Sequence, residues 1–391
     1  HELGVDQLPY WKVILDHPAY DGFWQAQALD KLLAKHKLTV PTMWEQGLFD
    51  QEDMWGAIHT YRALKAAGAP DSLNHLVMGP WFHSQVNREG RNLGWLVWAT
   101  DTTAEWRRDV LLPFFNQYLK PGSPAADTPK ALVYDTGADR WDHPAEFPRA
   151  CEKGCGVTSK PLYLEADGKL SFTAPAAGGA QFDEYVSDPA KPVPYLPRPV
   201  DRSGWRTWLV TDQRFVDGRP DVLTYISEPL TETMKLSGEV VAHIVASTSG
   251  TDSDWVVKVI DVLPEKTEAG GFGPAAGAAP DTSGIEQPLA IDIFRGRYRT
   301  SFEHPTAIEP DKPLPYVFTL PMINHTFKPR HRIMVQVQST LFPLYDRNPQ
   351  KFVPNIFTAK PADFQKATQR IWHTPGSQSF ISLPVVPVNQ P

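Results

Sequence analysis

The sequence predicts an α/β region followed by an all-β region. Up to about residue 140, helical periodicity alternates with short apolar runs, which is typical of a parallel sheet with helical crossovers. After residue 140 the helical periodicity stops, and short alternating runs recur between turn signals, as in a β-sandwich. Proline is also abundant, with 38 of 391 residues, about twice the usual ~5%. This proline content favours turns and irregular edges over a helical bundle.

The elements of the α/β region follow one another in a regular order. Residues 15–37 carry apolar residues at helical spacing and predict helices, and residues 38–44 predict a short buried strand. A helix is expected after Asp50, and residues 75–79 predict the second strand. Residues 103–120 predict a helix that is broken or kinked at its internal proline.

The all-β region begins with a predicted hairpin, in which residues 162–164 and 170–172 flank a turn at Asp167-Gly168. Short strands separated by proline-rich links suggest a β-sandwich of the jelly-roll type. The other predicted strands are residues 205–210, 222–226, 240–246, 255–263, 315–320, 333–338 and 380–386.

Composition and charge exclude several classes of function. Hydrophobic residues make up 41% of the chain and charged residues 21%, as in a folded protein. The net charge is −7 and there is no Lys/Arg run, so we expect no nucleic-acid partner. No apolar stretch approaches the ~18–20 residues of a membrane span, so we expect no membrane insertion. The chain starts at His1 rather than Met, and we expect a preceding segment to be missing.

Two cysteines, Cys151 and Cys155, are the only thiols in the sequence. They either close a small disulfide loop or remain two unpaired thiols. A disulfide would indicate an oxidising compartment such as a periplasm. Their spacing does not match a zinc site.

An acidic run lies between the first predicted strand and the helix that is expected to follow it. Asp50, Glu52 and Asp53 place three carboxylates within four residues. One interpretation is structural, because Asp50 suits a helix N-cap and the other two suit the first helical turn. The other is functional, because open α/β folds place their sites at the carboxyl edge of a parallel sheet.

His83 follows the second predicted strand in the segment GPWFHS, at the same edge of the sheet as Asp50. In α/β-hydrolases the triad runs in the order Ser, Asp or Glu, His, and Asp50 followed by His83 fits its last two members. His59 and His75 lie within predicted elements and are better explained by packing. The sequence contains no Gly-x-Ser-x-Gly nucleophile elbow.

These residues lie in segments that resemble those of the α-amino acid ester hydrolases. The resemblance extends through the whole chain. That family lies in a larger group with cocaine esterase, X-Pro dipeptidyl-peptidases and glutaryl acylases. The segments that carry the resemblance are HPAYDGFW (17–24), FDQEDMWGAIHTY (49–61), GPWFHSQVNREG (79–90), DVLLPFFNQYL (109–119), DWVVKVIDVLPE (254–265) and FPLYDRNP (342–349).

The resemblance implies an architecture. The group combines an α/β-hydrolase core, a helical cap and a non-catalytic jelly roll. We therefore expect residues 1–37 to be the end of the cap and its return to the core. Residues 38–140 would be the latter part of the α/β-hydrolase domain, and residues 141–391 would be the jelly roll.

The resemblance also implies roles for the site residues. Asp50 would orient His83, which would carry the proton of a catalytic serine. Glu52 and Asp53 match two members of an acidic cluster that holds the substrate ammonium. The serine, the oxyanion hole and a third carboxylate belong to an earlier part of the family sequence. We therefore expect this chain to supply the triad Asp and His but not the Ser.

The implied activity is hydrolysis and acyl transfer on α-amino acid esters and amides, including β-lactam antibiotics, through an acyl-enzyme intermediate. The alternatives are a glutaryl acylase, an X-Pro dipeptidyl-peptidase, or a jelly-roll binding module when the chain is isolated. As implied by the resemblance, we expect a periplasmic or secreted homotetramer whose partners are its small-molecule substrate and its own N-terminal part. No cofactor or metal is expected, because no EF-hand or HExxH pattern occurs and the carboxylates already have roles.

Overall fold

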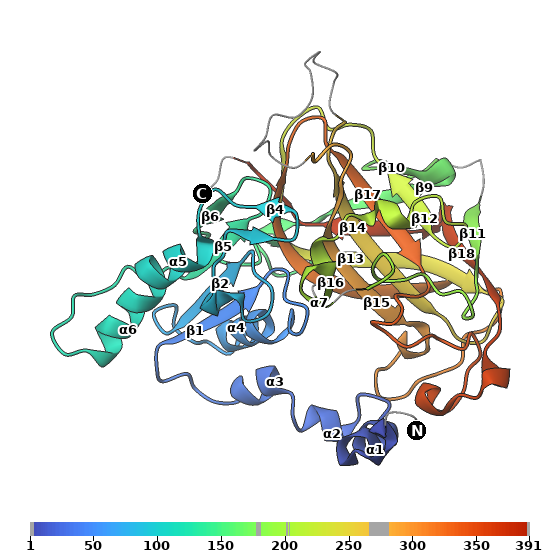
Figure 1. Cartoon of the computed structure of the whole chain (residues 1–391), viewed down its shortest axis with the longest axis horizontal. Coiled ribbons are helices and arrows are strands. Elements are labelled where there is room, and N and C mark those ends of the chain that lie inside the picture. Colours follow the sequence, from blue (N-terminus) through green and yellow to red (C-terminus); the bar gives the residue numbers. More distant parts are fainter. Residues whose placement is uncertain (1–3, 177–180, 201, 203, 266–280, 389–391) are drawn as a thin grey trace.

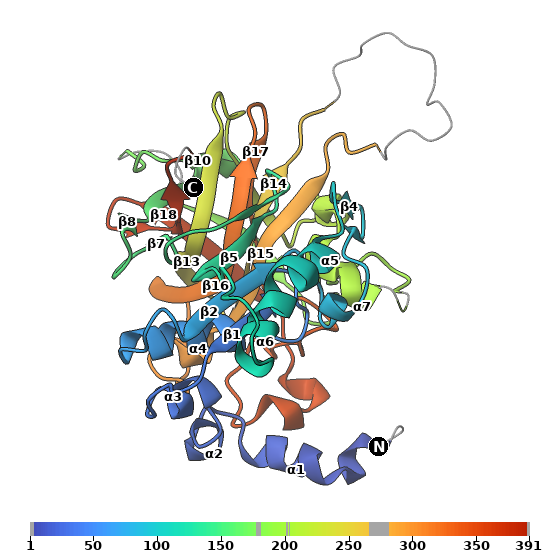
Figure 2. The ribbon, with the colours of Figure 1, turned by 90° about the vertical axis from the view of Figure 1, so that its left-hand side faces the viewer.

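A computed structural model describes residues 4–176, 181–200, 202, 204–265 and 281–388 of the chain. It combines an α/β part (residues 42–142) with a strand-rich part (residues 150–386), and the N-terminal helices lie beneath both in the view of Figure 1. Figure 2 shows the same arrangement from the side, with the long strands of the strand-rich part standing above the small sheet. None of the helices in the described part of the chain has the length and apolar character of a transmembrane span.

The α/β part is built on a small sheet with the order β1-β2-β5-β6. β1 (Thr42–Gly47), β2 (Asn74–Gly79) and β5 (Ala131–Asp135) run parallel, and β6 (Arg140–Asp142) is antiparallel to β5. The predicted parallel sheet with helical crossovers is therefore confirmed. A small hairpin, β3 (Asn92–Leu93) and β4 (Leu96–Val97), follows β2.

The boundaries of the strand predicted at residues 38–44 are wrong, because β1 begins only at Thr42. Pro41 has no N–H to donate, whereas the Thr42 amide donates to the Leu73 carbonyl at 2.8 Å. The strand also continues through the polar residues Glu45 and Gln46, which interrupt its apolar pattern.

Helices connect the parallel strands. α4 (Gly56–Ala66) joins β1 to β2, so the helix expected directly after Asp50 starts later than predicted. α5 (Thr102–Trp106) and α6 (Leu112–Leu119) lie between β2 and β5, joined by a π-helical turn at residues 107–111. The interruption expected at the proline thus occurs just before it, and Pro113 occupies the first turn of α6, where a missing N–H is tolerated.

The helix-rich start of the chain is confirmed, and it forms three short helices: α1 (Pro9–Asp16), α2 (Gly22–Gln25) and α3 (Leu29–Leu33). This segment touches both parts of the molecule. Asn355 donates to the Leu15 carbonyl at 2.9 Å and the Tyr298 hydroxyl to the Pro18 carbonyl at 2.6 Å, while α3 packs on α4. It therefore runs beneath the space between the two parts (Figure 1).

The strand-rich part is mostly antiparallel. The predicted hairpin is confirmed as β9 and β10, and β13 pairs with β16 along almost its whole length. Its strands are β7 (Ala150–Cys151), β8 (Val157–Thr158), β9 (Lys160–Glu165), β10 (Lys169–Ser171), β11 (Phe182–Ser187), β12 (Leu223–Ile226), β13 (Met234–Thr248), β14 (Asp254–Val262), β15 (Glu286–Arg295), β16 (Leu314–Phe327), β17 (Arg332–Gln338), β18 (Ala367–Thr374), β19 (Ser377–Gln378), β20 (Phe380–Leu383) and β21 (Val385–Val386).

The strand predicted at residues 205–210 is wrong. That segment forms α7 (Gly204–Thr207) and a 3-10 turn at Trp208–Val210. All three residues of the turn are buried. A short apolar run is compatible with a strand and with a buried helical turn. In residues 208–210 the apolar side chains are explained by the burial of the turn.

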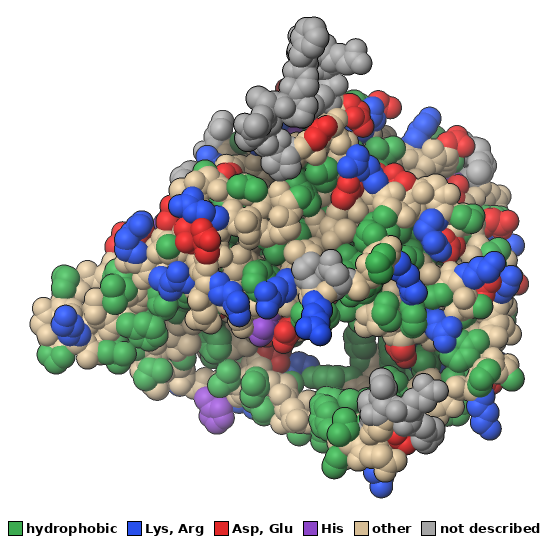
Figure 3. All heavy atoms as spheres, viewed as in Figure 1, with side chains coloured by type: hydrophobic (Ala, Val, Ile, Leu, Met, Phe, Trp, Pro, Cys, Tyr) green, Lys and Arg blue, Asp and Glu red, His purple; other side chains and the backbone are tan. Residues whose placement is uncertain are grey.

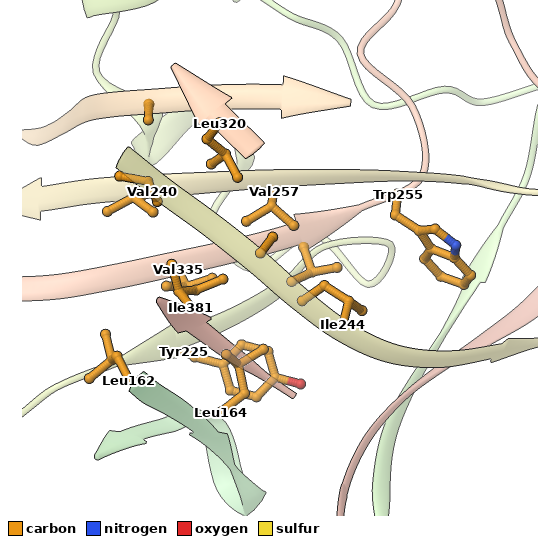
Figure 4. Close-up of a cluster of buried hydrophobic side chains, with 14 of the residues drawn as sticks. Leu162, Leu164, Tyr225, Val240, Ile244, Trp255, Val257, Leu320, Val335 and Ile381 are labelled. Atoms are coloured by element: carbon orange, nitrogen blue, oxygen red, sulfur yellow. The ribbon is translucent and has the colours of Figure 1, made fainter. Parts of the chain in front are cut away.

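One hydrophobic core holds the strand-rich part together. Val240 and Ile244 on β13 meet Val257 on β14 and Val335 on β17, although β13 is not paired with β14 or β17 (Figure 4). All four side chains are fully buried. This arrangement fits strand layers packed face to face, and the jelly-roll topology stays a prediction.

A polar seam joins the two parts of the molecule. Its members are Asp135 and Asp142 of the α/β part and Lys235, Asn324 and Thr326 of the strand-rich part. The ammonium group of Lys235 lies 3.1 Å from the Asp135 carboxylate, and the Asn324 amide donates to the Asp142 carboxylate at 2.9 Å. Because these groups are buried and paired, they fix how the two parts meet.

Cys151 and Cys155 form a disulfide in the structure, with an S–S distance of 2.05 Å. The bridge lies at β7, where Ala150 pairs with Gly238 of β13. Of the two alternatives left open by the sequence, the structure thus contains the closed loop.

The end of β1 requires glycine, which gives a first testable prediction. A Cβ atom at Gly47 would lie 2.3 Å from the Trp81 carbonyl oxygen, whereas one at Gly22 would have no neighbour within 4 Å. We expect Gly47→Ala to lower the free energy of unfolding by about 1–3 kcal/mol through overpacking. Gly22→Ala is the matched control and should leave it unchanged or slightly higher. Equal denaturation midpoints for the two variants would contradict the close approach of β1 to Trp81.

Candidate active site

The candidate site lies where β1 and β2 end side by side. The two strands finish in register at Gly47 and Gly79. The two segments that follow the strands remain in contact, since the Leu48 amide donates to the Gly79 carbonyl at 2.8 Å and the Phe49 amide to the Trp81 carbonyl at 3.2 Å. Asp50, directly after Phe49, and His83, two residues after Trp81, are therefore brought together.

Asp50 and His83 form a hydrogen-bonded pair. The Nδ1 atom of His83 lies 3.2 Å from both carboxylate oxygens of Asp50. The same carboxylate accepts the backbone amides of Glu52 and Asp53 at 2.9 and 3.0 Å, so Asp50 caps this turn rather than α4. Its side chain is 11% exposed, whereas that of His83 is 41% exposed. A carboxylate at Nδ1 orients the imidazole and leaves Nε2 available for proton transfer.

The loop that carries His83 is held at several points. The His83 amide donates to the Gln51 side chain at 3.1 Å, which ties it to the Asp50 turn. The fully buried Trp81 donates from its indole nitrogen to the Thr102 hydroxyl at 2.9 Å. Ser84 adopts a left-handed backbone with φ of 63°, a conformation that non-glycine residues reach only at some cost.

The carboxylates of Glu52 and Asp53, the two remaining acids of the run, lie in different surroundings. One oxygen of Glu52 lies 3.6 Å from Nε2 of His83, and this side chain is 48% exposed. Asp53 accepts the amides of Trp55 and Gly56 at 2.9 and 2.6 Å. Asp53, rather than Asp50, therefore accepts the first amide of α4, whose N-cap residue is Trp55.

A cavity of about 350 Å³ opens beside this pair, between the α/β part and the strand-rich part. Asp50 and Glu52 line one side of it, and residues of β15, β16 and the segment after β17 line the other. Figure 3 shows the molecule hollowed between the N-terminal helices and the two larger parts, with acidic side chains at the edge of the opening. Asp53 faces a second cavity, which it lines together with Glu45 and residues of α2 and α3.

Two carboxylates near the site did not stand out in the sequence. Glu45 lies on β1, where burial and the nearby charge of Asp50 raise the pKa of its carboxyl to about 7, against the opposing effect of His83. Asp292 lies on β15 and lines the 350 Å³ cavity, and burial raises its pKa to about 6. In the sequence each of these carboxylates is the single acid of a largely apolar run, Glu45 in TMWEQG and Asp292 in LAIDIF, and that is the feature by which they could have been found.

The two weaker histidine candidates make packing contacts, and His59 also lines the 350 Å³ cavity. His59 stacks on Trp55 with the ring centroids 3.4 Å apart, and burial together with the charge of Arg62 lowers its pKa to about 4. Nδ1 of His75 lies 2.9 Å from the Pro129 carbonyl. Among the residues that the structure describes, no three His, Cys, Asp or Glu side chains are grouped so as to hold a metal ion.

Comparison with known proteins places these features in a family. The model of the X-Pro dipeptidyl-peptidase C-terminal non-catalytic domain matches residues 124–382. The model of the X-Pro dipeptidyl-peptidase S15 family matches residues 3–85, which include Asp50 and His83. Cocaine esterase from Rhodococcus sp. (strain MB1 Bresler) is 28% identical over 95% of this chain and 61% of its own length.

Two solved structures are also similar. An α-amino acid ester hydrolase is 58% identical with a TM-score of 0.94, and the match covers 98% of this chain and 61% of that one. An aminopeptidase from the marine-sediment archaeon Thaumarchaeota archaeon is 46% identical with a TM-score of 0.91, covering 99% of this chain and 61% of the other. The chain thus spans about three-fifths of the length of these relatives.

The X-Pro dipeptidyl-peptidase models and these relatives agree with the fold of the chain. The chain belongs to the X-Pro dipeptidyl-peptidase and cocaine esterase group, and within that group it resembles the α-amino acid ester hydrolases.

Proposed function

We propose that the complete protein is a serine hydrolase that cleaves α-amino acid esters and the corresponding amides, including β-lactam antibiotics with an α-amino acyl side chain. One observation carries this proposal. His83 is oriented through Nδ1 by Asp50, while the Glu52 carboxylate lies 3.6 Å from Nε2. A proton-transfer group and an anion for a substrate cation are therefore adjacent.

In the proposed reaction His83 acts as a general base and then as a general acid. The serine hydroxyl attacks the ester carbonyl as Nε2 of His83 takes its proton, and the leaving alcohol receives that proton when the C–O bond breaks. Water then attacks the acyl-enzyme, His83 takes a proton from it, and the serine oxygen is released with that proton. Asp50 stabilises the imidazolium that forms twice in this cycle.

We infer that the serine belongs to a segment outside these 391 residues. The sequence has no Gly-x-Ser-x-Gly elbow, and the relatives are longer than the stretch that the chain matches. The oxyanion hole would come from the same segment.

The charge around His83 favours a cationic substrate. Asp50, Glu52 and Asp53 gather three carboxylates here, and in the described part of the chain no Lys or Arg forms an ion pair with them. Like charges held close together repel one another, and an ammonium group relieves that repulsion. Glu52 is therefore proposed to hold the α-amino group of the substrate, whereas Asp53, to which the resemblance assigns the same role, opens onto the neighbouring cavity. A glutaryl acyl group, which is anionic, fits this environment poorly.

An aminopeptidase activity is the second candidate, because one similar structure is described as an aminopeptidase. A peptide with a free N-terminus also presents an ammonium group next to the scissile carbonyl. The same acidic residues would serve both substrates, so the two candidates differ in the leaving group and not in the cation.

We also propose that the strand-rich part is a jelly roll and that the protein acts in an oxidising compartment, periplasmic or secreted. The disulfide between Cys151 and Cys155 supports this location, because such bonds are rare in reducing compartments.

The proposed roles of Asp50 and His83 predict a large loss of turnover. In the full-length protein, Asp50→Asn and His83→Ala should each lower kcat for an α-amino acyl ester by about 10⁴-fold, the scale set by other catalytic triads. Steady-state kinetics with an α-amino acyl p-nitrophenyl ester measures this. Asp127→Asn is a suitable control, because Asp127 is exposed and lies outside the cavity. Losses below tenfold for His83→Ala would rule out its proposed role.

The proposed role of Glu52 predicts a loss that depends on the substrate amine. Glu52→Gln should lower kcat/KM for an α-amino acyl ester by about 10- to 100-fold, as expected for a lost charge-assisted hydrogen bond. The ester that lacks the amino group should lose less than threefold. Equal losses on the two esters would show that Glu52 does not recognise the ammonium.

A further inference from the structure

The strand-rich part contributes a carboxylate of its own to the cavity beside His83. Asp292 lies on β15 between Ile291 and Ile293 and lines the same cavity as Asp50 and Glu52. Its Oδ1 atom accepts the backbone amide of Ile293 at 2.7 Å. The cavity is thus lined by carboxylates from both parts of the molecule.

Two other acids of the strand-rich part, Asp254 and Glu239, have cationic partners, and the half-buried Asp292 does not. Asp254 pairs with Arg295 at 3.1 Å, and Glu239, which lines the same cavity, pairs with Arg62 at 3.1 Å. Within the described residues no Lys, Arg or His forms an ion pair with Asp292. A carboxylate withdrawn from water is costly unless a cation accompanies it. Burial accordingly raises the pKa of Asp292 to about 6.

The rest of the cavity wall is largely apolar. Leu320, Met322, Leu341 and Leu344 line it together with Trp208. A ligand that suits this lining combines an apolar body with a positive charge. An α-amino acyl group with a hydrophobic side chain has both features, and so does a simple arylalkyl ammonium ion.

We propose that Asp292 is a specificity-determining residue that, together with Glu52, holds the ammonium-bearing acyl group in this cavity. This inference rests on the proposed function and deepens it. Asp292 touches the cation and not the reacting carbonyl, so it selects substrates without taking part in proton transfer. It also means that the strand-rich part supplies a recognition group in addition to its packing role.

Binding of a matched pair of probes to the full-length protein tests this inference. 2-Phenylethylammonium carries the cation and the apolar body, and 2-phenylethanol is its neutral counterpart. Isothermal titration calorimetry should show tighter binding of the ammonium ion to the unmodified protein. Asp292→Asn, which retains an oxygen for the Ile293 amide, should weaken ammonium binding about tenfold or more and leave the alcohol unchanged.

Two control variants make the result specific. Asp292→Glu retains the charge and should keep the preference for the ammonium ion. Asp127→Asn removes one exposed charge elsewhere and should change neither affinity. The inference is overturned if Asp292→Asn leaves the ammonium affinity intact, or if the affinities for both probes fall equally. Because binding requires no turnover, either result is independent of whether His83→Ala abolishes hydrolysis.

Discussion

The parallel pairing of β1 with β2 is the constraint on which the rest of the site depends. The register runs from Thr42 opposite Asn74 to Gly47 opposite Gly79, and it sets where both following loops begin. Gly47 lies against the Trp81 carbonyl at a distance that excludes a side chain. This close approach allows the Asp50 turn and the His83 loop to meet at hydrogen-bonding distance. A shift of one residue in this pairing would separate them.

The second constraint is the way in which the two parts meet. The buried Lys235, held by Asp135 of the sheet, fixes the strand-rich part against the α/β part. Residues of β15 and of the Asp50 turn line one cavity between the two parts. The chemistry of the site therefore depends on a contact between segments that are far apart in the sequence. The N-terminal helices add a further connection beneath the cavity, because they touch both parts.

Much of this architecture could be predicted from the sequence, because local patterns carry it. The alternation of strands and helices and the positions of Asp50 and His83 at strand ends follow from apolar runs and turn residues. The end of β1 could not, because Glu45 and Gln46 interrupt its apolar pattern. The apolar run at residues 205–210 predicts a strand, whereas its last three residues form a buried 3-10 turn. The place of Asp292 in the cavity could not be predicted either, because it depends on the long-range packing of β15.

We propose that His83 serves a serine nucleophile in a site that selects α-amino acyl groups. The most direct measurement is the pre-steady-state release of p-nitrophenol from an α-amino acyl p-nitrophenyl ester by the full-length protein. An acyl-enzyme that accumulates gives a burst of one equivalent per active site. We expect that burst for the unmodified protein and its loss in His83→Ala. A burst of undiminished rate and amplitude in His83→Ala would contradict it.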